Sequence, residues 1–284
     1  MNITHATYGG VDCLQRVQSF VKDRKLVLRA SNDLIGDTQP GVVKWLELEI
    51  NGVSYKIREG DTFVYPKSTT NRLGIWYSND QSNHPAVKKS LETIKIAAEN
   101  SADIVTCVWN RIENNPFHQV FSWNQSSSHL NQLLQILQCI YTAQTMGEYR
   151  YVSFLEHDVM YGEGYFDYPE FERGAVWTNM NYGGINREGW QHKGQNDEPM
   201  HQMTMHIEDA LEHFHGILGN ALVTNSGLIE TQTMQRKQWE APNQSIHINH
   251  GSHFTSHYNI YQKHNTYTEH PYWGNHSDYV HLFI

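Results

Sequence analysis

Apolar and polar side chains alternate through the first part of the chain. The alternating runs are residues 25–30, 42–50 and 54–58. A period of two residues is typical of strands that bury one face and expose the other. Asn51 and Gly52 stand between the second and third runs, and both residue types accept the positive φ angles of a tight hairpin turn. The pattern predicts a small all-β domain that contains a hairpin.

A polar segment rich in structure breakers, residues 66–72, follows this region. The pattern then changes: a short apolar run at 73–77 precedes Pro85, which suits a first helical position, and a second apolar run lies at 103–109. Strand, helix and strand in this order predict a β-α-β unit with parallel strands. The predicted domains are residues 1–68, a small β accessory domain, and residues 69–284, an α/β domain.

Two more helices are predicted from apolar residues at 3.6-residue spacing, at 130–141 behind Ser128 as N-cap and at 205–218. We expect residues 110–128 to be irregular. We expect residues 187–206 to form a loop that is mobile or that faces an acceptor substrate. A strand and turn are predicted at 177–186, where aromatic and amide side chains suit stacking on a sugar and hydrogen bonding to its hydroxyls.

The chemistry of the chain concentrates after one buried strand. Residues 151–155 are apolar, aromatic and β-branched, and Glu156, His157 and Asp158 follow at once. Ligands of open α/β sheets bind at the carboxyl ends of strands. Two carboxylates two residues apart at such an end can share Mg²⁺ or Mn²⁺, which prefer oxygen ligands. The plainer alternative is that both carboxylates cap the turn, and we favour the metal.

Composition and charge narrow the class of protein. A mean hydropathy of −0.61 and the absence of a long apolar run argue against a membrane span, and no amino-terminal signal is visible. We expect a cytoplasmic protein. Cys13, Cys107 and Cys139 lie in apolar segments and are predicted to be buried thiols. Residues 1–68 carry 9 Lys and Arg against 8 Asp and Glu, whereas the remainder carries 12 against 22.

The run Glu-Tyr-Arg-Tyr-Val-Ser-Phe-Leu-Glu-His-Asp-Val-Met-Tyr at 148–161 resembles the divalent-cation motif of GT-A glycosyltransferases, as a Glu-x-Asp variant of Asp-x-Asp. Segments 126–144, 179–181 and 246–251 resemble the preceding helix and two later segments of that superfamily. The resemblance implies a GT-A, Rossmann-like fold with a mostly parallel sheet flanked by helices. It also implies a metal site for Mn²⁺ or Mg²⁺ formed by Glu156, Asp158 and His250.

The same resemblance implies a nucleotide diphosphate sugar, best a UDP-sugar, as donor substrate. Candidates for contacts with the donor are Ser78, Asn79, Asp80 and His129. A polar loop that caps a helix explains the first three equally well, and a surface histidine explains the last. An inverting reaction needs a base to deprotonate the acceptor hydroxyl, and Glu208 or Asp209 is the candidate.

The amino-terminal β pattern is similar to a small β domain at the carboxyl terminus of a mitochondrial J-protein and in bacterial and phage proteins. Together with the GT-A pattern it resembles glycosyltransferases of tailed phages, some of which modify 5-hydroxymethylated pyrimidines in DNA. The resemblance therefore implies 5-hydroxymethylcytosine in DNA as acceptor. The acidity of residues 69–284 opposes DNA binding, because that binding relies on Lys and Arg, and a saccharide acceptor is the alternative.

Two functions of other classes stay open from the residues. One is a non-catalytic glycan-binding protein that uses its surface Trp and Tyr residues. The other is a metal hydrolase in which carboxylates and histidines hold two ions. Stabilisation by metal that also requires a nucleotide would distinguish the transferase from the glycan-binding protein and from the hydrolase.

Overall fold

The computed structural model describes residues 1–22, 25–65, 70–78, 84–123, 129–192, 199–224, 234–248 and 266–283. The chain divides into two compact units, Met1–Thr69 with Gln144–Gly147, and Thr70–Ala143 with Glu148–Ile284. The accessory and catalytic roles that the sequence suggests for the two parts stay predictions.

The first unit consists of two small antiparallel sheets around one core. One sheet has the order β2 (Val11–Asp12), β1 (Ile3–Tyr8), β5 (Trp45–Ile50), β6 (Val53–Arg58), and the other the order β3 (Val21–Lys22), β4 (Lys25–Arg29), β7 (Thr62–Tyr65). The predicted hairpin is confirmed: β5 pairs with β6, and Asn51 and Gly52 have φ angles of 52° and 80°. A five-residue helix, α1 (Leu14–Gln18), makes this unit not entirely β.

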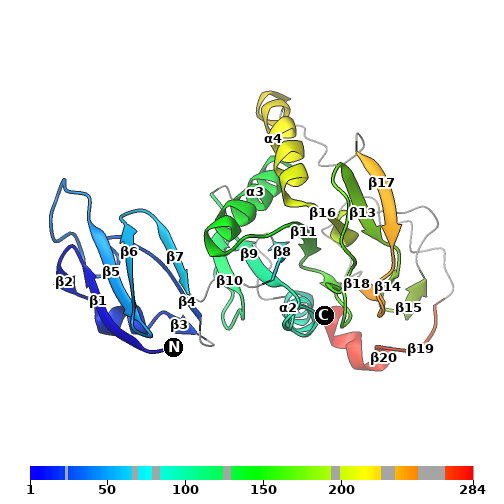
Figure 1. The fold of residues 1–284 in the computed structure, drawn as a ribbon. Helices are drawn as coiled ribbons and strands as arrows, with labels where there is room; N and C mark the ends of the chain where they lie inside the picture. The colour runs from blue at the N-terminus through cyan, green and yellow to red at the C-terminus, as the bar shows by residue number, and fades with distance from the viewer. Residues whose placement is uncertain are drawn as a thin grey trace. The chain divides into compact units, whose positions relative to one another are not determined.

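The second unit is a mixed α/β structure built on a seven-stranded sheet (Figure 1). Its strands, in spatial order, are β10 (His118–Phe121), β9 (Asp103–Val108), β8 (Arg72–Tyr77), β11 (Tyr151–Glu156), β16 (Met203–His206), β13 (Ala175–Asn179) and β17 (Gln235–Trp239). The pairs among β10, β9, β8 and β11 are parallel, as is the pair β13 and β17. Only β16 runs antiparallel to its two neighbours in this sheet.

The predicted β-α-β unit is confirmed by β8, α2 (Pro85–Ala97) and β9, which are consecutive, with the two strands parallel. Pro85 occupies the first turn, where its missing N–H costs nothing. His84 caps the helix, because its Nδ1 accepts a hydrogen bond of 3.1 Å from the backbone N–H of Ala86. Burial lowers the pKa of His84, which keeps this nitrogen unprotonated.

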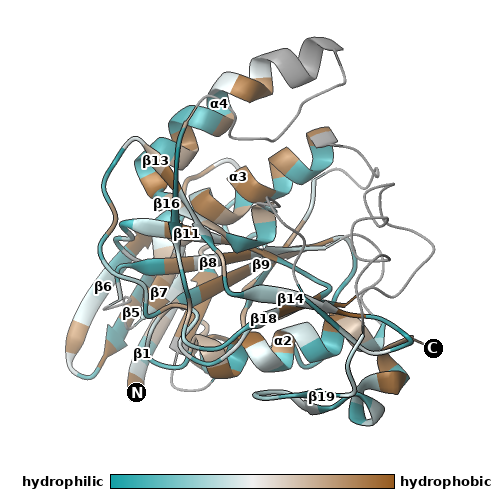
Figure 2. Ribbon diagram, turned by 90° about the vertical axis from the view of Figure 1, so that its right-hand side faces the viewer, coloured by the Kyte–Doolittle hydropathy of each residue, from teal (hydrophilic) through white to brown (hydrophobic). Residues whose placement is uncertain are grey.

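Helices cover both faces of the large sheet. Helix α2 lies on one face, and α3 (His129–Met146) and α4 (Ile207–Thr224) lie on the other (Figures 1 and 2). The central strands are buried on both sides, since β9 is buried at all six positions and β8 at five of six. A strand covered on both faces needs apolar side chains at successive positions rather than alternation.

A smaller sheet packs beside α2. Its order is β12 (Val159–Met160), β18 (Ser245–Ile248), β14 (Tyr182–Ile185) and β15 (Trp190–His192). Its core joins Met160, Trp190 and Ile246 to Ala86 of α2 and to Leu282. The last described elements are the hairpin β19 (Glu269–His270) with β20 (Gly274–Asn275) and the 3-10 helix η3 (His276–Phe283).

Three expectations from the sequence are wrong. The segment expected to be irregular contains β10, an edge strand of the large sheet. The segment expected to be a loop contains β15, the 3-10 helix η1 (Met200–Gln202) and β16, which lies between β11 and β13. The single strand expected at 177–186 is two strands, β13 and β14, in different sheets. All three errors involve strands of three to five residues, too short to show a period.

Two further expectations concern the interior and the membrane. Cys13, Cys107 and Cys139 are buried free thiols, as predicted. Among the described helices, none combines the length and the hydrophobicity that crossing a bilayer requires.

Candidate functional site

The candidate site lies where the parallel strands β8 and β11 end side by side. Glu156, the last residue of β11, pairs in register with Tyr77, the last residue of β8. From β8 the chain proceeds to β9 and β10 on one side, and it returns through α3 to β11 on the other side. Ligands of open α/β sheets bind in the crevice at such a reversal, outside the carboxyl ends of the strands. The topology therefore places Glu156 at a preferred ligand position.

Helix α2 holds the backbone that follows β11. Ser90 accepts a hydrogen bond of 3.2 Å from the indole Nε1 of Trp76 and donates one of 3.1 Å to the backbone oxygen of Glu156. Thr93 accepts one of 3.1 Å from the backbone N–H of Tyr161. These side chains are buried, so the turn that carries Glu156 and Asp158 rests on a rigid support.

The Glu156 carboxylate lies between a phenol and an imidazole. The Tyr77 hydroxyl donates to Oε1 over 3.4 Å, and Nδ1 of His201 lies 3.3 Å from Oε2. Burial, and then the charge of Glu156, raise the pKa of Tyr77 well above its usual value, so the phenol stays a donor at neutral pH. Gln132 on α3 donates to the same phenol oxygen over 3.3 Å. The orientation of Glu156 is thus set from β8, α3 and η1.

The Asp158 carboxylate is buried and faces the smaller sheet. Nε2 of His247, on β18, lies 3.3 Å from its Oδ2. The backbone oxygen of Asp158 accepts a hydrogen bond of 2.7 Å from Ile248, and Val159 pairs with His247. Strand β18 therefore positions a histidine against Asp158 through its register with β12.

The two imidazoles bring the two carboxylates into one group. The rings of His201 and His247 stack with centroids 5.5 Å apart and an angle of 14° between their planes. Nε2 of His201 is buried and has no hydrogen-bond partner among the described residues. A buried polar atom without a partner is costly to the fold. Carboxylate oxygens are ligand types that suit Mn²⁺ and Mg²⁺, and imidazole nitrogens also bind divalent metals.

The described residues do not by themselves form a finished metal centre. Within the parts of the chain that the structure describes, no three His, Cys, Asp or Glu side chains converge on one point. His250, the third ligand that the resemblance implies, lies outside the described residues, as do Asn79 and Asp80. His129 begins α3, and only its backbone is described.

Ser78, the remaining candidate for the donor, lies directly after β8 at the same edge. Its backbone N–H donates to the backbone oxygen of Cys107 over 3.1 Å, and its backbone oxygen accepts from the side-chain amide of Gln135 over 2.8 Å. The hydroxyl is buried and has no hydrogen-bond partner among the described residues. The backbone of Ser78 is therefore held in place, while no described residue engages its hydroxyl.

Glu208 and Asp209 do not join this group. They begin α4, next to the residue of β16 that pairs with Tyr151, at the opposite end of β11 from Glu156. Five residue steps along β11 separate its two ends, about 17 Å at roughly 3.3 Å per step. Asp209 accepts hydrogen bonds from Arg173 Nε and Nη2, at 3.1 and 2.9 Å, and from the Gly174 N–H at 2.7 Å. This geometry opposes a role as base for an acceptor held at Glu156.

The aromatic and amide side chains expected to contact a sugar at 177–186 have structural partners instead. Trp177 stacks on Phe171 with centroids 4.6 Å apart. The buried Asn179 donates to Gln202 over 2.8 Å and accepts from the backbone of Asn181 and Ala241. These two residues therefore hold chain segments together. Asn181 differs, because it lines a pocket.

Sequence reasoning missed His201, His247 and Tyr77. His201 lies in the segment expected to be a loop, and His247 is one of many histidines near the end of the chain, so composition did not separate them. A signal exists for His247 alone: it lies between two isoleucines in a short β-like run, three residues before the proposed ligand His250.

No protein-family model matches the sequence, and neither does any curated protein. Among solved structures, the chain is similar to a glycosyltransferase involved in the glycosylation of the major capsid of PBCV-1. The identity is 11%, and the match covers 62% of this chain and 92% of the other, with a TM-score of 0.38. A TM-score at this level carries no argument about fold or activity.

Proposed function

We propose that the protein is a glycosyltransferase, which moves a sugar from a nucleotide diphosphate donor, best a UDP-sugar, to a hydroxyl acceptor. The observation that carries the proposal is the position of Glu156 and Asp158, at the carboxyl end of β11 beside that of β8, with buried imidazoles beside both carboxylates. The resemblance of residues 148–161 to the GT-A cation motif supports the same reading.

The difficult step of such a reaction is the departure of a charged diphosphate. A divalent ion, Mn²⁺ or Mg²⁺, supplies positive charge that stabilises this leaving group. Glu156 and Asp158 would hold the ion, with His250 as a further ligand. Tyr77 and His201 would fix the Glu156 carboxylate, and Ser78, Asn79, Asp80 and His129 would contact the nucleotide.

The proposed reaction also involves an acceptor substrate and a catalytic base. The likeness to phage enzymes favours 5-hydroxymethylcytosine in DNA, and the acidity of the second domain favours a saccharide. We assign no base, since Glu208 and Asp209 lie at the far end of β11. A cytoplasmic location is part of the same proposal.

The test is an assay with a panel of UDP- and GDP-sugars, with Mn²⁺ or with EDTA, in the presence of hydroxymethylcytosine-containing DNA or of saccharide acceptors. Released nucleoside diphosphate and the mass of each acceptor are measured. We expect metal-dependent release of UDP together with a hexose or pentose adduct on one acceptor.

Other outcomes would contradict this reading. Saccharide binding without any response to nucleotide would favour a non-catalytic glycan-binding protein. Metal-dependent cleavage of a substrate without transfer would favour a hydrolase.

A further inference from the structure

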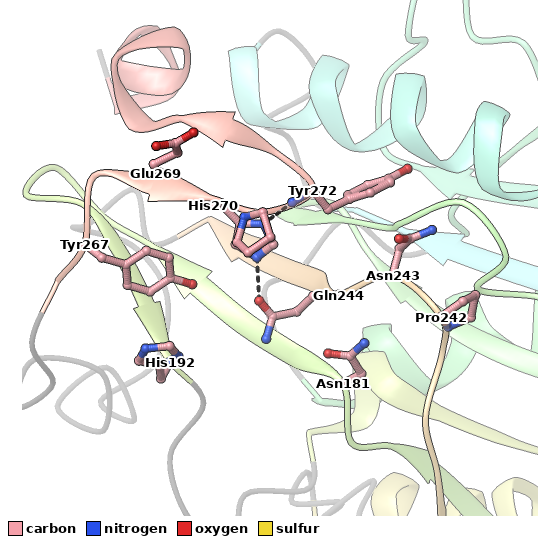
Figure 3. A pocket seen from close by; sticks show the side chains of 10 residues that line it. Asn181, His192, Pro242, Asn243, Gln244, Tyr267, Glu269, His270 and Tyr272 are labelled. Atoms are coloured by element: carbon pink, nitrogen blue, oxygen red, sulfur yellow. Dashed lines mark hydrogen bonds between the residues drawn. The ribbon is translucent and has the colours of Figure 1, made fainter.

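A concavity opens beside the smaller sheet. It has a volume of about 690 Å³ and lies between the turn after β13, the segment before β18 and the hairpin β19–β20 (Figure 3). Pockets of about 300 to 1,000 Å³ are typical of small-molecule sites. The size is therefore suited to a ligand of one or a few sugar units.

The electrostatics of the pocket disfavour phosphates. Among the described residues, its lining contains no Lys or Arg and one carboxylate, Glu269. The lining histidines are His192 and His270, and burial, followed by the charge of His192, lowers the pKa of His270 to about 4. His270 is therefore neutral at physiological pH. Nucleic-acid binding depends on cations that neutralise phosphates, so this pocket suits an uncharged ligand.

The hydrogen bonds of His270 fix the direction of a neighbouring amide. Its Nδ1 accepts from the backbone N–H groups of Tyr272 and Trp273, each at 3.1 Å. A neutral imidazole whose Nδ1 accepts must carry its proton on Nε2. That Nε2 lies 2.6 Å from Oε1 of Gln244, so the oxygen is the acceptor. The amide nitrogen of Gln244 is left on the side away from His270, as Figure 3 shows.

Two asparagines present the complementary atoms. Asn181 donates its amide N–H to the Ala241 oxygen over 2.8 Å, and Asn243 donates to the Glu163 oxygen over 2.9 Å. Their nitrogens are thereby turned away, and their carbonyl oxygens face the remaining pocket residues in Figure 3. The pocket thus offers fixed donors on Gln244 and fixed acceptors on the asparagines. A sugar hydroxyl both donates and accepts, and it matches such a mixed set.

Apolar surface completes the lining. Pro242 is exposed, and Tyr272, another residue of the lining, is 40% exposed. Rings of this kind pack against the C–H faces of sugars while amides bind the hydroxyls. The pocket is also connected to the candidate site: Asn181 precedes Tyr182, whose ring lies 6.3 Å from that of His201, the partner of Glu156.

We propose that this pocket binds an uncharged saccharide through the amide of Gln244, the carbonyls of Asn181 and Asn243 and the Tyr272 ring. The assignment of that saccharide as the acceptor rests on the proposed glycosyl transfer. The binding itself does not.

The experiment uses the full chain at pH 8 in EDTA, without a nucleotide sugar. Binding is measured by saturation-transfer NMR and calorimetry with methyl glycosides of glucose, galactose, mannose and N-acetylglucosamine and with their oligosaccharides. The test variant is Gln244→Glu, because a carboxylate still accepts from His270 but has lost both N–H donors. The matched control is Gln235→Glu, the same change at an exposed position on β17.

We expect the wild-type protein and Gln235→Glu to bind the same saccharide equally, and Gln244→Glu to bind it at least fivefold more weakly. A panel without any binder, or equal affinity in Gln244→Glu, would overturn the proposal. Binding of hydroxymethylcytosine-containing DNA that depends on Gln244 would overturn it too. If the protein binds a saccharide in a Gln244-dependent manner but has no transferase activity, the proposed saccharide site is supported and only the proposed transferase function is refuted.

Discussion

Two acidic pairs lie at opposite ends of β11, and their partners differ in kind. Glu156 and Asp158 follow the carboxyl end and face His201 and His247, each at 3.3 Å. Glu208 and Asp209 lie beside the amino end, at the start of α4, and both pair with Arg173. The sequence alone shows two similar pairs of carboxylates.

The difference in partners separates chemistry from structure. Arginine is always charged, and with the helix N-terminus it stabilises Asp209 permanently. An imidazole changes its charge near neutral pH and can also bind a metal. The pair beside imidazoles, at the carboxyl end of β11, is the one we expect to act on a ligand.

The largest effect is expected for Asp158→Asn, which keeps the shape and removes the charge. Turnover should fall about 100- to 1,000-fold, the scale on which removing transition-state charge stabilisation acts. Initial rates with UDP-sugar and Mn²⁺ measure it, and circular dichroism checks the fold. Full activity of a folded Asp158→Asn variant would remove the basis of the metal assignment.

Glu156→Gln should have a milder effect, about 10- to 100-fold on turnover. Its carboxylate is a quarter exposed, and an amide can still accept from Tyr77. Tyr77→Phe serves as the control for orientation, with a smaller loss than Glu156→Gln. A Glu156→Gln variant as inactive as Asp158→Asn would mean that the two carboxylates act as one unit.

At the other end of β11, Asp209→Asn should lower the melting temperature by several degrees and leave the turnover of the folded protein unchanged. The reason is the loss of charge from three hydrogen bonds that Arg173 and Gly174 donate. Glu208→Gln, at an exposed side chain, should change the melting temperature less. A selective loss of turnover in Asp209→Asn would reverse the comparison and restore the base assignment.

The smallest effect is expected for deletion of residues 1–66, because both acidic pairs lie in the second unit. The truncated protein should fold and bind nucleotide within about twofold of the full chain, since compact units with their own cores fold independently. Calorimetry with UDP-sugar and Mn²⁺ measures this. Insoluble or nucleotide-blind protein would show that the first unit is integral to the second.

The longer elements of the second unit could be predicted from the sequence, and the short strand β16 could not. Apolar runs and a helix-starting proline predicted β8, α2, β9 and β11, because these elements are long enough to show a pattern. The four residues of β16 are buried but carry Thr and His, and a length of four shows no period. Missing β16 also hid the position of α4, since the antiparallel pairing of β16 with β11 is what carries Glu208 and Asp209 away from Glu156.

The sequence could predict only those parts of the candidate site that lie close together along the chain. Glu156 and Asp158 are adjacent to the strand that positions them, so a short motif contains them. His201 and His247 reach them through η1 and through the register of β18 with β12, which are tertiary relations. Likewise, the neighbouring sequence does not show that Asn179 accepts a hydrogen bond from the backbone of Ala241 while Asn181 lines a pocket.

Thermal unfolding with Mn²⁺ and a panel of UDP-sugars, separately and together, tests the central claim most directly. A ligand at 100 times its Kd stabilises the folded state by about 2.7 kcal/mol, so binding is readily seen. We predict stabilisation that requires both metal and nucleotide in the wild-type protein and in Asp209→Asn, and none in Asp158→Asn. Equal stabilisation of Asp158→Asn, or its loss in Asp209→Asn alone, would contradict the claim that the carboxyl end of β11 holds the site.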